Sequence, residues 1–231
     1  MNVQLRPYQG EAVRCCFGLW EKRVLNLLLV AAVGAGKTII AAMIMKLHLR
    51  SPNKRVLFLA HREELLEQTV EKLALIDDQI VAGIEQGRNI CPAHAKVMVA
   101  SIATVKNIER LARWCPLKDI SLVLVDECHH STAVTYADLL HQISAQNPNR
   151  HLLGITATPI RMDGENLSTL YDRLAYRIDM PQLIDAGYLC PIRGLTVRTN
   201  ASIAGVPLTA EGDYDPGKLA EAIDTEARNR V

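Results

Sequence analysis

Five short, continuously apolar segments alternate along the chain with stretches of helical periodicity. A continuous apolar run is typical of a parallel strand covered on both faces, because neither side of the strand then meets water. The runs are Leu25–Ala31, Val56–Ala60, Val97–Ser101, Leu122–Val125 and Leu152–Thr156. Between them, Thr38–Leu49 and Glu63–Ile76 have the apolar spacing of helices; Leu66, Val70 and Leu73 share one stripe. We therefore predict an α/β fold with a mostly parallel central sheet flanked by helices.

The alternation weakens after Pro159. Residues 160–199 hold short apolar pieces interrupted by Asp163-Gly164, Pro181 and Pro191. Residues 200–231 are rich in Gly, Asp and Glu, with one predicted helix over Gly217–Arg228. We predict one domain over residues 1–198, followed by a connector or the incomplete start of a second domain over residues 199–231.

The composition places the chain among globular proteins. Of its 231 residues, 49% are hydrophobic and 22% charged, with a net charge of +1. The longest apolar run, Leu27–Val33, is too short to span a membrane, and the first ten residues lack the pattern of a signal peptide. The six cysteines show no disulfide spacing, so we expect free thiols and a cytoplasmic protein. The first fifty residues have a balance of +5, a difference too small to identify a polyanionic partner.

A glycine-rich loop joins the first apolar run to a helix. The octet AAVGAGKT, Ala31 to Thr38, fits the Walker A pattern with Ala in place of its first Gly. Small residues let the backbone wrap a phosphate, whose charge is met by backbone N–H groups and a helix N-terminus. Lys37 would then reach the β- and γ-phosphates, and the Thr38 hydroxyl would bind Mg²⁺. The alternative is a plain strand-to-helix turn with an exposed lysine.

An acidic pair ends another apolar run. Leu122–Val125 leads into Asp126-Glu127-Cys128-His129-His130. An aspartate at the carboxyl end of a buried strand can hold Mg²⁺, and Glu127 is placed to activate a water molecule for attack on a γ-phosphate. A transition-metal site is the weaker interpretation, because three consecutive residues do not easily converge on one ion.

The order of these motifs resembles the first RecA-like domain of a superfamily 2 helicase or translocase. After AAVGAGKT come VDECHH, of the DExH type, and GITATPIR at Gly154–Arg161, in which Thr156-Ala157-Thr158 resembles motif III. Leu5–Gln9 resembles the adenine-reading Q-like motif, while Val56–Leu65 and Ala100–Val105 stand in the places of motifs Ia and Ib. The resemblance spans residues 3–198 and is strongest to the branch with RadD-type repair helicases and type III restriction motor subunits.

The resemblance implies a role for each matched residue. The ATP contacts would be Arg6 and Gln9 at the adenine, and the loop residues Ala31, Ala32, Val33, Gly34, Ala35, Gly36, Lys37 and Thr38. The catalytic residues would be Lys37, Asp126 and Glu127, with Mg²⁺ on Thr38 and Asp126. The residues that couple the nucleotide to nucleic acid would be His129, Thr156 and Thr158. The nucleic-acid contacts would be His61, Arg62, Ser101 and Thr104. For motifs Ia and Ib the alternative is a helix cap, and for Gln9 a polar residue on an N-terminal helix.

The resemblance also implies a partner domain. Motors of this superfamily hydrolyse ATP between two RecA-like domains, and the second supplies arginine fingers. We find no second Walker-like sheet after residue 198 and expect a second RecA-like domain in cis or in trans. The sequence thus predicts an ATP-binding and ATP-hydrolysing motor domain of a bacterial or phage-encoded DNA helicase or translocase, with no membrane partner. Alternatives are an RNA helicase domain, a small-molecule P-loop kinase, and a nucleotide-gated interaction module with little hydrolysis.

Overall fold

The computed structural model describes residues 4–60, 64–130, 134–158, 167–194, 203, 205–209 and 214–223. They fall into two compact units, one through Cys190 and one from Pro191 onward. In the second unit, helix α8 (Pro216–Ile223) follows an antiparallel bridge between Leu208 and Tyr214. The expected helix over Gly217–Arg228 is thus observed through Ile223, and its remainder lies outside the described residues.

A seven-stranded parallel sheet forms the centre of the first unit, in the order β3-β4-β2-β5-β6-β1-β7. The strands are β1 (Asn26–Ala31), β2 (Arg55–Ala60), β3 (Ala82–Glu85), β4 (Val97–Ser101), β5 (Ile120–Asp126), β6 (His151–Thr156) and β7 (Arg173–Ile178). The five predicted strands are confirmed, with ends shifted by at most two residues. The fold class is confirmed as well.

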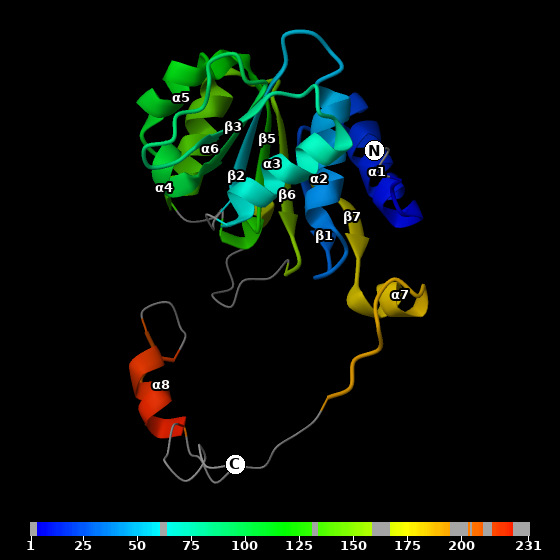
Figure 1. Cartoon of the computed structure of the whole chain (residues 1–231), viewed down its shortest axis with the longest axis vertical. Helices are drawn as coiled ribbons and strands as arrows, with labels where there is room; N and C mark the ends of the chain where they lie inside the picture. The colour runs from blue at the N-terminus through cyan, green and yellow to red at the C-terminus, as the bar shows by residue number, and fades with distance from the viewer. Residues whose placement is uncertain are drawn as a thin grey trace. The chain divides into compact units, whose positions relative to one another are not determined.

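Helices cover both faces of this sheet (Figure 1). One face carries α1 (Pro7–Glu21), α2 (Lys37–His48) and α3 (Glu64–Ile76). The other carries α4 (Ile102–Val105), α5 (Ile108–Trp114) and α6 (Val134–Gln146). The shorter elements are three 3₁₀ turns, Leu117–Asp119, Cys128–His130 and Leu167–Thr169, and helix α7 (Met180–Asp185).

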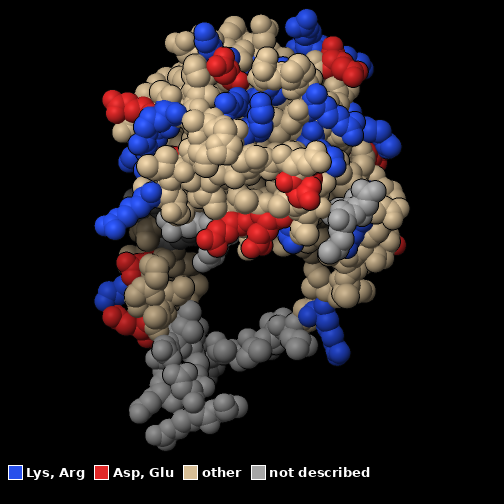
Figure 2. Space-filling model, turned by 45° about the horizontal axis from the view of Figure 1, so that its top comes forward, with Lys and Arg blue, Asp and Glu red and all other residues tan. Residues whose placement is uncertain are grey.

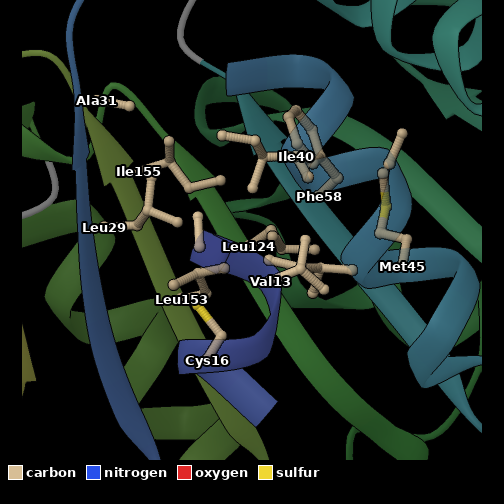
Figure 3. Close-up of a cluster of buried hydrophobic side chains, with 14 of the residues drawn as sticks. Val13, Cys16, Leu29, Ala31, Ile40, Met45, Phe58, Leu124, Leu153 and Ile155 are labelled. Carbon is tan, nitrogen blue, oxygen red and sulfur yellow. The ribbon is translucent and has the colours of Figure 1, made fainter. Parts of the chain in front are cut away.

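The core between the sheet and α1, α2 and α3 is closely packed (Figure 3). Val13 and Cys16 from α1 and Met45 from α2 meet Phe58 from β2 and Leu153 from β6, all buried. Full burial of one such large apolar side chain stabilises a fold by about 1.5–3 kcal/mol. This core fixes the positions of the strands, whose carboxyl ends carry predicted site residues.

Two strands were missed in the sequence. β3 is only four residues long, and β7, RLAYRI, carries an arginine at its first and fifth positions and is exposed or half-buried except at Ile178. β7 lies at the edge of the sheet and pairs with β1, so one side of it faces solvent and its sequence lacks the continuous apolar run of an inner strand. β7 thus lies in the stretch where the alternation of the sequence weakens.

Candidate functional site

The loop between β1 and α2 passes twice through left-handed backbone. Gly34 and Gly36 have φ values of +83° and +77°, where a Cβ atom is strained. A Cβ on Gly36 would also lie 2.6 Å from Nε2 of Gln9. Gly36 caps the N-terminus of α2, so the unpaired backbone N–H groups of the first turn begin where Lys37 and Thr38 start the helix. A loop of this shape suits a phosphate group.

The rest of the octet is held by neighbouring strands. Ala31 is the buried last residue of β1, and the Ala32 N–H donates a hydrogen bond of 3.0 Å to the carbonyl of Ile178 in β7. The Ala35 N–H donates to the Ala32 carbonyl at 3.1 Å, whereas the Val33 side chain is exposed. The start of the loop is thus hydrogen-bonded to β7, one of the two strands that were not predicted from the sequence.

Gln9 ties the start of α1 to this loop. Its Oε1 accepts a hydrogen bond from the Arg6 N–H at 3.0 Å, and its Nε2 donates to the Ala35 carbonyl at 3.0 Å. The two partners determine how the amide is turned, since an N–H can only donate and a carbonyl can only accept. One N–H and one lone pair of the amide remain beside a pocket of about 260 Å³, lined by Gln4, Arg6, Gln9, Gly34, Gly36 and Ile39.

The acidic motif lies at the carboxyl end of β5, with β6 between it and β1. Glu127 Oε1 is 2.9 Å from Lys37 Nζ, so the structure brings the two ends of the predicted catalytic set together. Asp126 is buried. Desolvation is the main cause that raises the pKa of its carboxyl group, the neighbouring Glu127 carboxylate adds to the rise, and Lys37 opposes it. Glu127 has a φ of +47°, and its N–H donates to Asp126 Oδ1 at 3.0 Å.

These oxygen atoms fit a divalent cation. Burial and the adjacent Glu127 carboxylate disfavour the negative charge on Asp126, and a hard cation would relieve that cost. Thr38 supplies a hydroxyl next to Lys37, at the start of the same helix. The residues present therefore suit Mg²⁺ better than a soft transition metal.

Three polar side chains link the acidic motif to the end of β6. His129 Nδ1 lies 2.9 Å from Thr156 Oγ1 and 3.5 Å from Glu127 Oε2. Thr156 is fully buried, its hydroxyl donates to the Thr158 carbonyl at 3.1 Å, and it accepts from the Thr158 N–H at the same distance. Glu127, His129, Thr156 and Thr158 thus form one connected polar group, which reaches the end of this described segment.

The predicted nucleic-acid residues are only partly visible. His61 and Arg62 lie outside the described residues. Ser101 ends β4, is 7% exposed, and its Oγ lies 3.0 Å from Thr104 Oγ1. Because β2 separates β4 from β5, Ser101 and Thr104 belong to a different part of the carboxyl edge than the nucleotide loop.

A groove beside Ser101 and Thr104 contains residues that the sequence did not single out. Glu85 is 1% exposed at the end of β3, and Arg110 Nε donates to its Oε1 at 2.6 Å. Arg113 donates to the same oxygen at 3.3 Å, and the Cys91 N–H donates to Oε2 at 2.7 Å. The buried carboxylate thus holds two arginines from α5 at the surface. An Arg-x-x-Arg spacing on a short helix was the one available sequence signal.

Two adjoining hollows of about 620 and 640 Å³ lie along these arginines. Both are lined by Gly87, Arg88, Asn107 and Arg110; one adds Arg113, and the other adds Ser101 and Thr104. We call the surface formed by Arg88, Asn107, Arg110 and Arg113 the arginine groove. On the face seen in Figure 2, basic and acidic side chains are interspersed, and the basic ones form no continuous band.

Within the described ranges, no cluster of three or more His, Cys, Asp or Glu side chains is arranged for metal binding. No disulfide joins any of the six cysteines, and Cys128 inside the acidic motif is buried, which raises the pKa of its thiol. Among the helices that the structure describes, none is both long and apolar enough to pass through a membrane.

Comparison with known proteins identifies the family. The model of the family described as "Type III restriction enzyme, res subunit" matches residues 2–161, which include the nucleotide loop and the acidic motif. The chain belongs to this family. The res-subunit match, together with the parallel sheet, confirms that the first unit is a first RecA-like domain of the superfamily 2 helicase type, as the motif order indicated.

Individual relatives agree with the res-subunit assignment. The chain is 29% identical to the putative ATP-dependent helicase IRC3 of Saccharomyces cerevisiae, over 98% of this chain and 34% of that protein. It is 27% identical to the putative mitochondrial helicase irc3 of Schizosaccharomyces pombe, over 97% and 37%. Its fold matches the Hef helicase domain of Pyrococcus furiosus with a TM-score of 0.57 and 26% identity, over 75% of this chain and 38% of that one. The chain thus spans about a third of the length of these curated relatives.

Proposed function

We propose that this chain is the ATP-binding motor domain of a DNA helicase or translocase, which hydrolyses ATP with Mg²⁺ to move on or unwind nucleic acid. The observation that carries the proposal is the 2.9 Å pair between Lys37 and Glu127 at the carboxyl edge of the sheet. It places a cation suited to a triphosphate beside a carboxylate suited to a general base. The His129–Thr156 contact then connects that carboxylate to the next strand.

Each residue of the site would have its own role in binding or hydrolysis. The backbone N–H groups from Gly34 to Thr38 would bind the phosphates, and Lys37 would move from Glu127 to the β- and γ-phosphates. Glu127, released from Lys37, would accept a proton from the attacking water. Thr38 and Asp126 would hold Mg²⁺, which neutralises charge on the transferred phosphoryl group. Gln9 would read the adenine edge with its remaining N–H and lone pair, beside Arg6.

The arginine groove would bind the nucleic-acid backbone. Arg88, Arg110 and Arg113 offer guanidinium groups for phosphates, and Ser101 and Thr104 line the same surface. Contacts of this kind are independent of base sequence and weaken with salt. A second RecA-like domain, in cis or in trans, would complete the ATP site with arginine fingers, which are worth about 10³–10⁵ in rate.

Nucleotide binding tests the proposal first. We expect mant-labelled ATP to bind in the presence of Mg²⁺, and Lys37→Ala to weaken binding about 10–100-fold, because a charge-assisted contact contributes about 1.5–3 kcal/mol. Lys46→Ala is the matched control, since Lys46 lies on the same helix but pairs with Asp77. Equal ATP affinity for Lys37→Ala and the wild type would overturn the ATP site.

Nucleic-acid preference is tested separately. Turnover is measured with single-stranded DNA, duplex DNA and RNA of matched length, and binding by direct competition between them. We expect DNA to compete more strongly than RNA and to stimulate any turnover. Stronger competition by RNA would favour an RNA helicase domain, and ATP binding indifferent to every nucleic acid would favour the interaction module.

A further inference from the structure

Two residues just after α7 contact the nucleotide loop and its neighbour Arg6. The Leu189 side chain lies against Gly34, where an added Cβ would be 2.8 Å from Leu189 Cδ2. The Tyr188 ring packs edge-on against Tyr8, with ring centres 5.0 Å apart. The Arg6 guanidinium carbon lies 5.2 Å from the centre of the Tyr188 ring, within the range of a cation–π contact. None of the predicted site residues comes from this segment.

The end of α7 holds these side chains in place. Gly187, with a φ of +74°, follows the helix, and its N–H donates to the Ile184 carbonyl at 2.9 Å. The Tyr188 N–H donates to the Leu183 carbonyl at 2.8 Å, which completes a Schellman motif. Leu183 is fully buried in the core. Tyr188 and Leu189 are therefore presented to the loop by a defined turn rather than by a free strand.

The contacts of Tyr8 extend this connection to the phosphate side. The Tyr8 hydroxyl donates to the Ala35 carbonyl at 3.0 Å, the same oxygen that accepts from Gln9. Arg6 donates to the Tyr8 hydroxyl at 3.2 Å. Tyr188 thus holds both Arg6 and Tyr8, and Arg6 lines the pocket at the base side of the loop.

We propose that Tyr188 and Leu189 are positioning residues for ATP: Tyr188 holds Arg6 at the nucleobase, and Leu189 supports the Gly34 turn that binds the phosphates. The proposal rests on the proposed ATP site. It adds to that site two residues from the segment directly before Pro191, where the second unit begins. The two residues act on different parts of one ligand, so their effects are separable.

The roles of Tyr188 and Leu189 are distinguished by measuring the binding of three ligands: ATP, GTP and inorganic tripolyphosphate. Tripolyphosphate carries the phosphates without a base. For Tyr188→Ala we expect ATP affinity to fall about 3–10-fold, which corresponds to one cation–π contact, with tripolyphosphate affinity unchanged and ATP less well distinguished from GTP. Tyr188→Phe should bind as the wild type does, because its ring is retained. Leu189→Ala should weaken ATP and tripolyphosphate alike, and Ile192→Ala, at an exposed position, should weaken neither.

The neighbouring Cys190 supplies a second readout. Its side chain is exposed, so its alkylation can be followed by peptide mass mapping and resolved from the other cysteines. We expect ATP to slow alkylation of Cys190 at least about twofold, because a loop closed on phosphates holds Leu189 more firmly. The effect should be absent in Lys37→Ala.

The outcomes distinguish this proposal from the ATP site itself. If the wild type binds ATP and Lys37→Ala does not, the ATP site stands. If Tyr188→Ala then weakens ATP and tripolyphosphate equally, or neither of them, the role at the nucleobase is wrong. Retained tripolyphosphate affinity in Tyr188→Ala excludes a general folding defect of that variant. Unchanged tripolyphosphate affinity in Leu189→Ala would overturn the support of the Gly34 turn.

Discussion

The nucleotide site and the arginine groove both lie at the carboxyl ends of strands of one sheet, and they share two structural features. Each has a left-handed glycine, Gly36 with a φ of +77° and Gly87 with a φ of +52°. Each has a short ion pair, between Lys37 and Glu127 at 2.9 Å and between Arg110 and Glu85 at 2.6 Å. They differ in the exposure of the acid.

The difference in exposure indicates different roles for the two carboxylates. The Glu127 side chain is 31% exposed, whereas that of Glu85 is 1% exposed. Glu127 can therefore exchange Lys37 for water and a proton, because solvent reaches it. Glu85 is enclosed by two arginines and a backbone N–H, so its carboxylate can only hold them in place. The exposed ion pair is therefore the one proposed for catalysis, and the enclosed one is proposed to hold the arginines in place.

Exchanging each acid for its amide gives the largest contrast. Glu127→Gln should lower single-turnover hydrolysis of bound ATP about 10²–10⁴-fold, the usual contribution of a general base, and change the free energy of unfolding by less than about 0.5 kcal/mol. Turnover is followed with radiolabelled ATP and stability with urea. Glu71→Gln, at an exposed position on α3, is the control. Hydrolysis that survives in Glu127→Gln would remove its role as base.

The same exchange in the groove should act on stability. Glu85→Gln leaves two arginines without a carboxylate partner, so we expect a loss of about 1–3 kcal/mol in the free energy of unfolding. Urea denaturation measures this, and the affinity for mant-labelled ATP should stay unchanged. A loss of ATP affinity with intact stability would mean that the two regions are not separate.

The two glycines test the crowding of the nucleotide loop. Gly36→Ala should lower ATP affinity about 10-fold, because its Cβ must displace Gln9 in addition to the strain of about 1–2 kcal/mol of a left-handed alanine. Gly87→Ala carries the same strain, but a Cβ there meets nothing within 4 Å, so ATP affinity should not change. Titration of both variants with mant-labelled ATP makes the comparison, and equal losses would contradict it.

The smallest effect is expected from single arginines of the groove. Arg88→Ala and Arg113→Ala should each reduce the slope of log K against log salt for DNA binding by about 1, the value for one phosphate contact. Fluorescence anisotropy at several salt concentrations measures this slope. Lys118→Ala, on an exposed turn outside the groove, is the control. An unchanged slope in both variants would place the nucleic acid elsewhere.

The parts predicted well are those in which neighbouring residues decide the structure. The inner strands were recognisable because both faces are buried, and the nucleotide loop because its glycines, lysine and threonine are consecutive. Edge strand β7 was not predicted because charged side chains occupy exposed positions along it. The arginine groove was not predicted because Glu85 and Arg88 come from one segment and Arg110 from another, and together they match no motif.

The sequence by itself determined the α/β class, the phosphate loop and the acidic motif, because each depends on the local order of residue types. Only the tertiary structure decided that Lys37 meets Glu127, that Glu85 is enclosed, and that Tyr188 and Leu189 lie against Arg6 and Gly34. The side-chain contacts among these residues join positions from 25 apart (Glu85 and Arg110) to 182 apart (Arg6 and Tyr188) in the chain. They depend on which strands are neighbours in the sheet, and strand order follows from packing of the whole domain rather than from any local pattern.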